Sequence, residues 1–245
     1  MLNKSILLAS IALCLSFAVA KAQVFSTGTI TGDSDVETVG TVLDAYAFNY
    51  SGIDFTVNDV NFTSTSNING TYTGYTFNGP GIDGTGGGIV PSSTGGQDTN
   101  LSTSLQDLLG NGVHNYGGGD ALELTGLTSG QTYSLQLFIN SNSHDSRSQA
   151  WSDGAAVSNT VTTGGNEAGN PGVNDGDNTG YDPAYITDVF TAMGTTHTVD
   201  AVYSGTSAQL SGFVLEVAPE PSTWALMGLS LAGLAFLARR SLPRS

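Results

Sequence analysis

The chain has 245 residues, with 21 acidic and six basic residues and a formal net charge of −15. Its 33 glycines and low charge content favour a single all-β domain. Five of the six basic residues lie in the two ends, so residues 23–218 hold 20 acidic residues and only one basic residue, Arg147, a net charge of −19. A body with this charge excludes nucleic acid as a partner.

The first 22 residues have the three parts of a secretory signal peptide. Lys4 precedes an apolar run over residues 6–20, and Ala20-Lys21-Ala22 places small residues at the cleavage position. We predict cleavage before Gln23, with cleavage after Ala20 as the alternative; a permanent anchor is disfavoured because the run is short for a membrane span. The mature chain is then exported by the Sec machinery. Because the single cysteine lies in this run, the mature chain has neither disulfides nor a thiolate metal site.

The body, residues 23–217, consists of short strand patterns separated by turn-forming residues, which predicts a β-sandwich or jelly roll. Residues 54–63 predict a hairpin, because Asn58 and Asp59 tolerate the positive φ angles of a two-residue turn. Residues 99–110 have leucines at helical spacing, a polar start and a terminal glycine. They predict one short helix that caps the sandwich.

Residues 121–140 predict a second hairpin. Leu122 and Leu124 alternate with polar residues before a turn at residues 128–131, and residues 133–139 alternate after it. Further strands are predicted at residues 41–50, 184–192, 196–205 and 208–217. The last of these strands has a predicted bulge at Ser211-Gly212. Long structureless loops are predicted at residues 78–98 and 164–182.

The tail, residues 218–245, is unlike the body. Its apolar run, residues 224–238, is about 22 Å long as a helix at about 1.5 Å per residue, against a hydrocarbon core of about 30 Å, so it predicts a marginal transmembrane helix. The basic end, residues 239–245, should stay in the cytoplasm and place the body on the other side of the inner membrane. The residues that set this topology are Arg239, Arg240 and Arg244.

The stretch "PEPSTWALMGLSLAGLAFLARR" closely resembles the PEP-CTERM sorting domain, with Pro-Glu-Pro, a nearby Trp, a Gly/Ala/Leu helix and terminal arginines. The resemblance implies that Pro219, Glu220 and Pro221 are recognised by an exosortase, a membrane cysteine transpeptidase of bacteria that make exopolysaccharide. Release or transfer to the cell surface would follow. The alternative is a permanent C-terminal anchor with a proline-containing linker before the membrane.

The body is also similar to the β-rich bodies of many PEP-CTERM surface proteins. The similarity rests on "TVNDVNFT", "LELTGLTSGQTYSLQLFI", "SRSQAWSDG" and "YITDVFTAMGTTHTV". It implies a jelly roll of the kind used for carbohydrate binding, although strand and turn patterns transfer fold better than function.

One candidate glycan site follows the most regular predicted strand. Trp151 would stack on a sugar ring, while Asp145, Arg147 and Gln149 would bond its hydroxyl groups. The structural alternative is that Arg147 pairs with a carboxylate and Trp151 fills the edge of the sandwich.

A candidate calcium site lies in the acidic loop of residues 170–183. Asn174, Asp175, Asp177 and Asp182 offer the oxygen ligands that Ca²⁺ prefers. The alternative is a solvated loop of Asx turns with no cation.

The sequence contains no histidine spacing of a zinc site, no nucleophile elbow and no phosphate-binding loop. We therefore expect a non-enzymatic exported surface or matrix protein without a cofactor, associated with exopolysaccharide or biofilm. The alternatives are a secreted polysaccharide-active hydrolase and a lectin-like carbohydrate-binding module.

Overall fold

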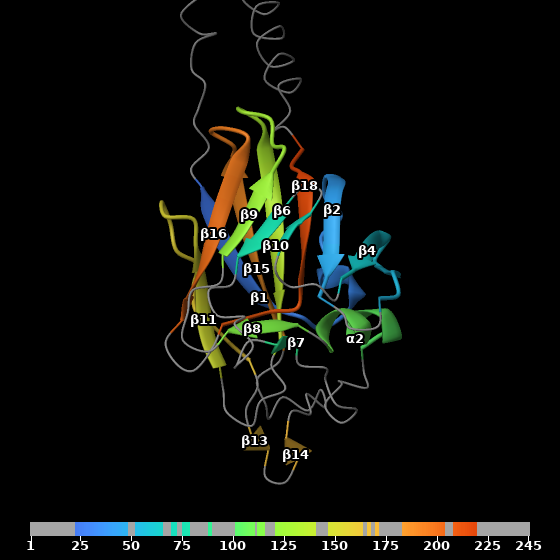
Figure 1. Cartoon of the computed structure of the whole chain (residues 1–245). Helices are drawn as coiled ribbons and strands as arrows, with labels where there is room; N and C mark the ends of the chain where they lie inside the picture. Colours follow the sequence, from blue (N-terminus) through green and yellow to red (C-terminus); the bar gives the residue numbers. More distant parts are fainter. Residues whose placement is uncertain are drawn as a thin grey trace, which may run out of the picture.

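The computed structural model describes residues 23–48, 52–65, 70–72, 75–78, 88–89, 101–110, 112–115, 121–140, 147–163, 166–167, 170–171, 183–203 and 208–219. In these ranges the chain forms two large β-sheets, two small ones and one α-helix. The all-β prediction is confirmed. Figure 1 shows the two large sheets face to face, with the helix beside one of them.

The seven-stranded sheet has the order β1 (Val24–Thr29), β15 (Ala184–Thr191), β10 (Thr132–Ile139), β18 (Gly212–Val217), β2 (Thr41–Ala47), β4 (Val60–Ser64) and β3 (Phe55–Val57). The six-stranded sheet has the order β12 (Val161–Thr163), β11 (Arg147–Ser152), β16 (Thr196–Tyr203), β9 (Ala121–Thr125), β6 (Tyr75–Asn78) and β5 (Gly70–Tyr72). The small sheets are β17 (Ala208–Leu210), β8 (Val113–Asn115) and β7 (Gly88–Ile89), and β13 (Asn166–Glu167) with β14 (Asn170–Pro171). The strands pair antiparallel, except that β2 and β4 are parallel.

The main core lies between the two large sheets. Leu135 and Leu137 of β10 belong to the same buried cluster as Leu122 and Leu124 of β9. Because residues two apart in a strand point to the same face, both leucines of β10 face this core. Full burial of each leucine stabilises the fold by about 1.5–3 kcal/mol.

A second core covers the lower half of the outer face of the seven-stranded sheet. The helix α2 (Thr103–Leu109) buries Leu105 and Leu108 there, in one cluster with Phe62 and Phe138. Its first turn is capped by Ser102, whose Oγ accepts a hydrogen bond from the backbone N–H of Leu105 at 3.2 Å. The predicted helix is confirmed over residues 103–109, but it packs on a face of the seven-stranded sheet instead of capping one end of the sandwich.

The predicted hairpin of residues 54–63 is confirmed as β3 and β4. Its two turn residues, Asn58 and Asp59, have φ angles of 46° and 64°, which is the backbone geometry of a type I′ turn. The Asn58 side chain also donates a hydrogen bond of 2.8 Å to the Val36 carbonyl. The hairpin turn thereby supports the loop that precedes β2. This loop contains the short 3₁₀ helix η1 (Asp33–Asp35).

The predicted hairpin of residues 121–140 is wrong. The turn exists, with a Gln131 N–H to Thr128 C=O bond of 3.1 Å. However, β9 pairs with β16 and β6 in one sheet, whereas β10 pairs with β15 and β18 in the other. The two strands therefore form an arch across the core. Both arrangements require the same alternation of apolar residues, so the pattern did not distinguish them.

The predicted strand of residues 208–217 is divided at Ser211 into β17 and β18, which belong to different sheets. At the start of β18 a Cβ on Gly212 would lie 2.5 Å from the Tyr46 carbonyl oxygen, so a side chain is excluded there. The register irregularity of this strand lies between Leu215 and Glu216 instead of at the predicted bulge.

The two predicted long loops hold short strands where the structure describes them, namely β7 in the first loop and β13 and β14 in the second. In the described part of the chain, no helix has the length and apolar character needed to span a bilayer. The predicted signal helix in residues 1–22 and the predicted tail helix of residues 224–238 lie outside the described residues.

Candidate functional site at the junction of body and tail

The last strand of the body leads directly into the tail. β18 lies inside the seven-stranded sheet, where Val217 pairs with Tyr133 on one side and Thr41 on the other. One residue later, the Ala218 N–H donates a 3.0 Å hydrogen bond to the Thr132 carbonyl. Pro219 follows immediately and is exposed. The start of the tail is therefore held by the sheet and has no free linker before it.

Both ends of the described chain leave the sandwich at the same end. Val24 of β1 pairs with Val189, Val189 pairs with Ser134, and Ser134 pairs with Glu216 of β18. These residues form one row across four strands. Figure 1 shows the start of β1 and the finish of β18 at the upper end of the molecule.

A cavity of about 450 Å³ lies beside the junction. Its walls include Val39 and Gly40 before β2, Gln131 before β10, and Val217 and Pro219. A Cβ atom on Gly40 would overlap the carbonyl oxygen of Val217, so the loop reaches the junction only because this residue is glycine.

A polar cluster lies next to this cavity, on the upper half of the outer face of the seven-stranded sheet. Glu37 accepts hydrogen bonds from Ser134 Oγ and Thr187 Oγ1, each 3.0 Å long. Its own backbone N–H donates to Gln136 Oε1 at 3.0 Å, and Gln136 Nε2 donates to the Asp35 carbonyl at 2.7 Å. These bonds hold the loop before β2 against β10 and β15.

Glu216 is the buried carboxyl group of this cluster, with 1% of its surface exposed. Its Oε2 accepts a 2.9 Å hydrogen bond from the Gly40 N–H, whereas Oε1 has no hydrogen-bond partner among the described residues. Burial raises the pKa of Glu216, and the charge of Glu37 raises it further, against the opposing effect of the Gly40 and Val39 N–H groups.

A second polar contact crosses the core near the same end. Nε2 of His197 on β16 lies 2.9 Å from Oδ2 of Asp188 on β15, and Asp188 is fully buried. The imidazole stacks on Phe190 with ring centroids 3.6 Å apart. The Gln23 side chain donates to both carboxylate oxygens of Asp188, at 3.3 and 3.4 Å. The first residue predicted for the mature chain is therefore attached to this pair.

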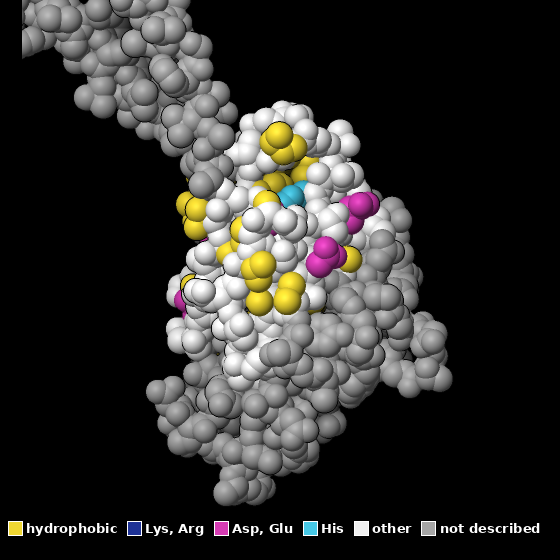
Figure 2. Space-filling model, turned by 90° about the vertical axis from the view of Figure 1, so that its left-hand side faces the viewer, with side chains coloured by type: hydrophobic (Ala, Val, Ile, Leu, Met, Phe, Trp, Pro, Cys, Tyr) yellow, Lys and Arg dark blue, Asp and Glu magenta, His cyan; other side chains and the backbone are white. Residues whose placement is uncertain are grey.

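One side of the described sandwich carries few charged side chains. Figure 2 shows one face with separate apolar side chains, a histidine and a few acidic groups, and no Lys or Arg in view. Within the ranges that the structure covers, no three His, Cys, Asp or Glu side chains are grouped as metal ligands.

The structure corrects the predicted role of Trp151. Its side chain is 0% exposed in the main core, so neither ring face is available to a sugar. Gln149 is 2% exposed, and its amide pairs with the backbone of Gln209 through two 2.6 Å bonds. Both residues have structural roles. Arg147 pairs through its backbone with Thr163, but its side chain and the whole of Asp145 lie outside the described residues.

The calcium prediction and most of the tail prediction also fall outside the described residues. These residues are Asn174, Asp175, Asp177 and Asp182 of the acidic loop, Glu220 and Pro221 of the sorting motif, and the basic residues Arg239, Arg240 and Arg244. Those roles stay predictions.

The sequence analysis missed Glu37 and Glu216. One signal was present for Glu216, because it is the single charged residue in the otherwise apolar strand "GFVLEV". Glu37 gave no such signal, since it lies in a polar loop and reaches its partners only through the folded sheet.

No curated protein matches the chain. The model of the PEP-CTERM protein-sorting motif matches residues 217–240. The matched range begins at Val217, the last residue of β18, and includes Pro219, which the structure places just beyond the sheet. The chain therefore carries a PEP-CTERM protein-sorting motif, which marks it as an exported protein whose tail is directed to an exosortase.

Proposed function

We propose that this chain is a non-enzymatic surface or matrix protein, delivered by exosortase processing of its tail and associated with exopolysaccharide or biofilm. The observation that carries the proposal is the direct connection between β18 and the sorting motif. Because no linker separates them, the processing enzyme meets Pro219 against the folded body, and cleavage releases a compact sandwich.

The positions of the two ends support the same route. In the precursor, the Sec signal and the tail helix would both lie in the inner membrane, with the body outside the cytoplasm. A body whose ends leave from one side meets this requirement without unfolding. Removal of both ends would leave a soluble body with a net charge of −19, which favours dispersal in a hydrated polysaccharide matrix.

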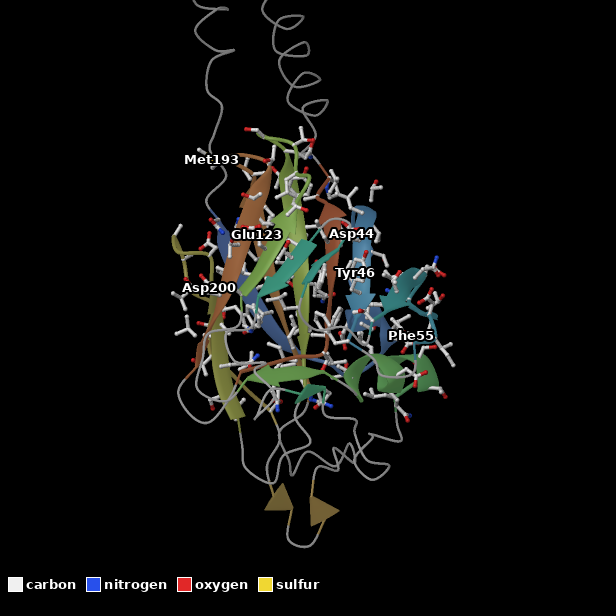
Figure 3. All side chains as sticks on the ribbon, in the orientation of Figure 1. Asp44, Tyr46, Phe55, Glu123, Met193 and Asp200 are labelled. Atoms are coloured by element: carbon white, nitrogen blue, oxygen red, sulfur yellow. The ribbon has the colours of Figure 1, made fainter. Side chains whose placement is uncertain are left out.

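The hydrolase alternative needs a pair of carboxyl groups on an open surface. Glu123 of β9 and Asp200 of β16 are one such candidate pair, because they alternate with buried core residues and lie on the outer face of the six-stranded sheet (Figure 3).

The experiment compares the purified chain with a Glu123→Gln/Asp200→Asn variant on a panel of glycans. We expect no reducing-sugar release from either protein, and co-sedimentation of both with the exopolysaccharide of the producing cells. Turnover that the double variant loses would support the hydrolase instead. Tight binding to one defined glycan on an array would support the lectin-like module.

A further inference from the structure

The loop before β2 and the outer face of the seven-stranded sheet enclose two carboxyl groups, those of Glu37 and Glu216. Ser134 and Thr187 donate their hydroxyl groups to the two oxygens of Glu37. Glu216 lies directly opposite Ser134 in the ladder between β18 and β10. Side chains at opposite positions of neighbouring strands have Cβ atoms about 4.5–5.5 Å apart, so four oxygen-bearing side chains converge at one place.

The unpaired atom of this cluster is Oε1 of Glu216. It belongs to a side chain that is 1% exposed, and it has no hydrogen-bond partner within the described ranges. A buried carboxyl group is either protonated and neutral or, when ionised, paired with a cation or bound to a metal ion. In its ionised form, a lone oxygen of this kind beside a second carboxylate calls for a positively charged ligand.

No Lys or Arg lies on the described strands of the seven-stranded sheet or in the loop before β2. Arg147 is the single Lys or Arg between residues 23 and 219, and it lies on β11 of the opposite sheet. A cation that pairs with Glu216 must then come from solution.

We propose that Glu37 and Glu216 bind a calcium ion, with the hydroxyl groups of Ser134 and Thr187 beside it. Calcium takes six to eight oxygen ligands at about 2.3–2.6 Å in flexible geometry, whereas magnesium requires a near-ideal octahedron. The remaining ligands would be water from the adjacent cavity, whose wall includes Gly40 and Val217.

The site has a structural consequence beyond sorting. A calcium ion here joins the loop before β2 to β18, only three residues before Pro219. It would stabilise the last strand at the position where the tail leaves the sheet. The residues of this site are different from those of the acidic loop, residues 170–183.

The test uses the full chain in detergent, freed of metal with a chelator and titrated with CaCl₂ by calorimetry and thermal unfolding. We expect wild-type protein to bind Ca²⁺ and to melt at a higher temperature with it. Glu216→Gln and Glu37→Gln should each lower the affinity at least tenfold and remove most of the calcium-dependent rise in Tm. Glu123→Gln, the same charge change on the other sheet, should leave both quantities unchanged.

An Asp175→Asn/Asp177→Asn variant separates this site from the acidic loop. If that variant abolishes the calcium response and Glu216→Gln does not, the proposal is overturned. The same holds if wild-type protein gives neither heat nor a change in Tm. Glutamine keeps the shape of Glu216 and removes a buried charge, so circular dichroism should show a folded variant. If Glu216→Gln does not fold, the calcium affinity and Tm of Glu37→Gln test the proposal instead.

Discussion

Asp188 and His197 connect the two sheets of the sandwich through a 2.9 Å contact between Oδ2 and Nε2. Asp188 points into the core between Ile186 and Phe190, both of which are buried there. His197 comes from β16 of the opposite sheet and covers Phe190 with its ring. This pair is therefore a polar bridge across the core between the two sheets.

We expect His197→Ala to lower the free energy of unfolding by about 1–3 kcal/mol, because the fully buried Asp188 carboxylate loses its main partner. Urea unfolding of the purified chain measures this change. Met193→Ala is the control at the same end of the molecule: Met193 is 92% exposed, so its removal should change stability by less than about 0.5 kcal/mol. Equal effects of the two substitutions would show that the bridge contributes no stability.

Trp151→Ala should destabilise the body by about 3–5 kcal/mol, because it leaves a large cavity in the main core. Trp151→Phe should cost less, since the indole Nε1 has no hydrogen-bond partner among the described residues. Chemical unfolding curves of the three proteins give the order of stability. A Trp151→Ala protein that folds normally but no longer binds a glycan would contradict this core role and support sugar binding by Trp151.

Gly40→Ala should loosen the junction of body and tail, because the added Cβ meets the Val217 carbonyl. The expected loss is about 1–3 kcal/mol, typical of overpacking at a tight contact. Gly32→Ala in the same loop is the matched control, as an added Cβ there has no neighbour within 4 Å. The difference in Tm between the two variants measures the effect, and identical Tm values would contradict the close approach.

Asp44 predicts a specific pH dependence of stability. Burial raises its pKa above the ordinary value of 3.8, so the folded protein holds the Asp44 proton more tightly than the unfolded chain does. The stabilisation is complete below pH 3.8 and is lost as the pH rises through the folded-state pKa. Asp44→Asn should therefore increase Tm at pH 7 and flatten its decline above pH 3.8.

The control for Asp44→Asn is Asp200→Asn, which makes the same charge change at an exposed position of the other sheet. Melting curves over a pH series compare the three proteins. If the Asp44→Asn curve runs parallel to that of the wild type, the burial of Asp44 does not contribute to the pH dependence.

Local signals in the sequence predicted the elements that depend on neighbouring residues. The Asn58-Asp59 turn and the Ser102-capped helix formed as expected, because backbone preference and capping act over a few positions. The arch between β9 and β10 was mistaken for a hairpin, since the alternation of β10 fits pairing within a sheet and packing between sheets equally well.

At the candidate site too, features set by neighbouring residues were predicted and features set by the tertiary fold were not. Pro219 and its motif were recognised from a contiguous stretch of sequence. The Glu37–Glu216 cluster joins residues from opposite ends of the body through the register of β10 and β18, which sequence spacing does not reveal. The role of Trp151 stayed open between sugar binding and core packing, because an isolated Trp after a strand fits both; its burial supports core packing.

The intact mass of the protein from its own cells, in washed membranes and in the medium, tests the central claim most directly. Exosortase processing predicts a mature species that begins near Gln23 and ends near Pro221, without the apolar run of residues 224–238. A membrane-bound species that extends to Ser245, with no shorter form in the medium or at the surface, would contradict processing and make the tail a permanent anchor.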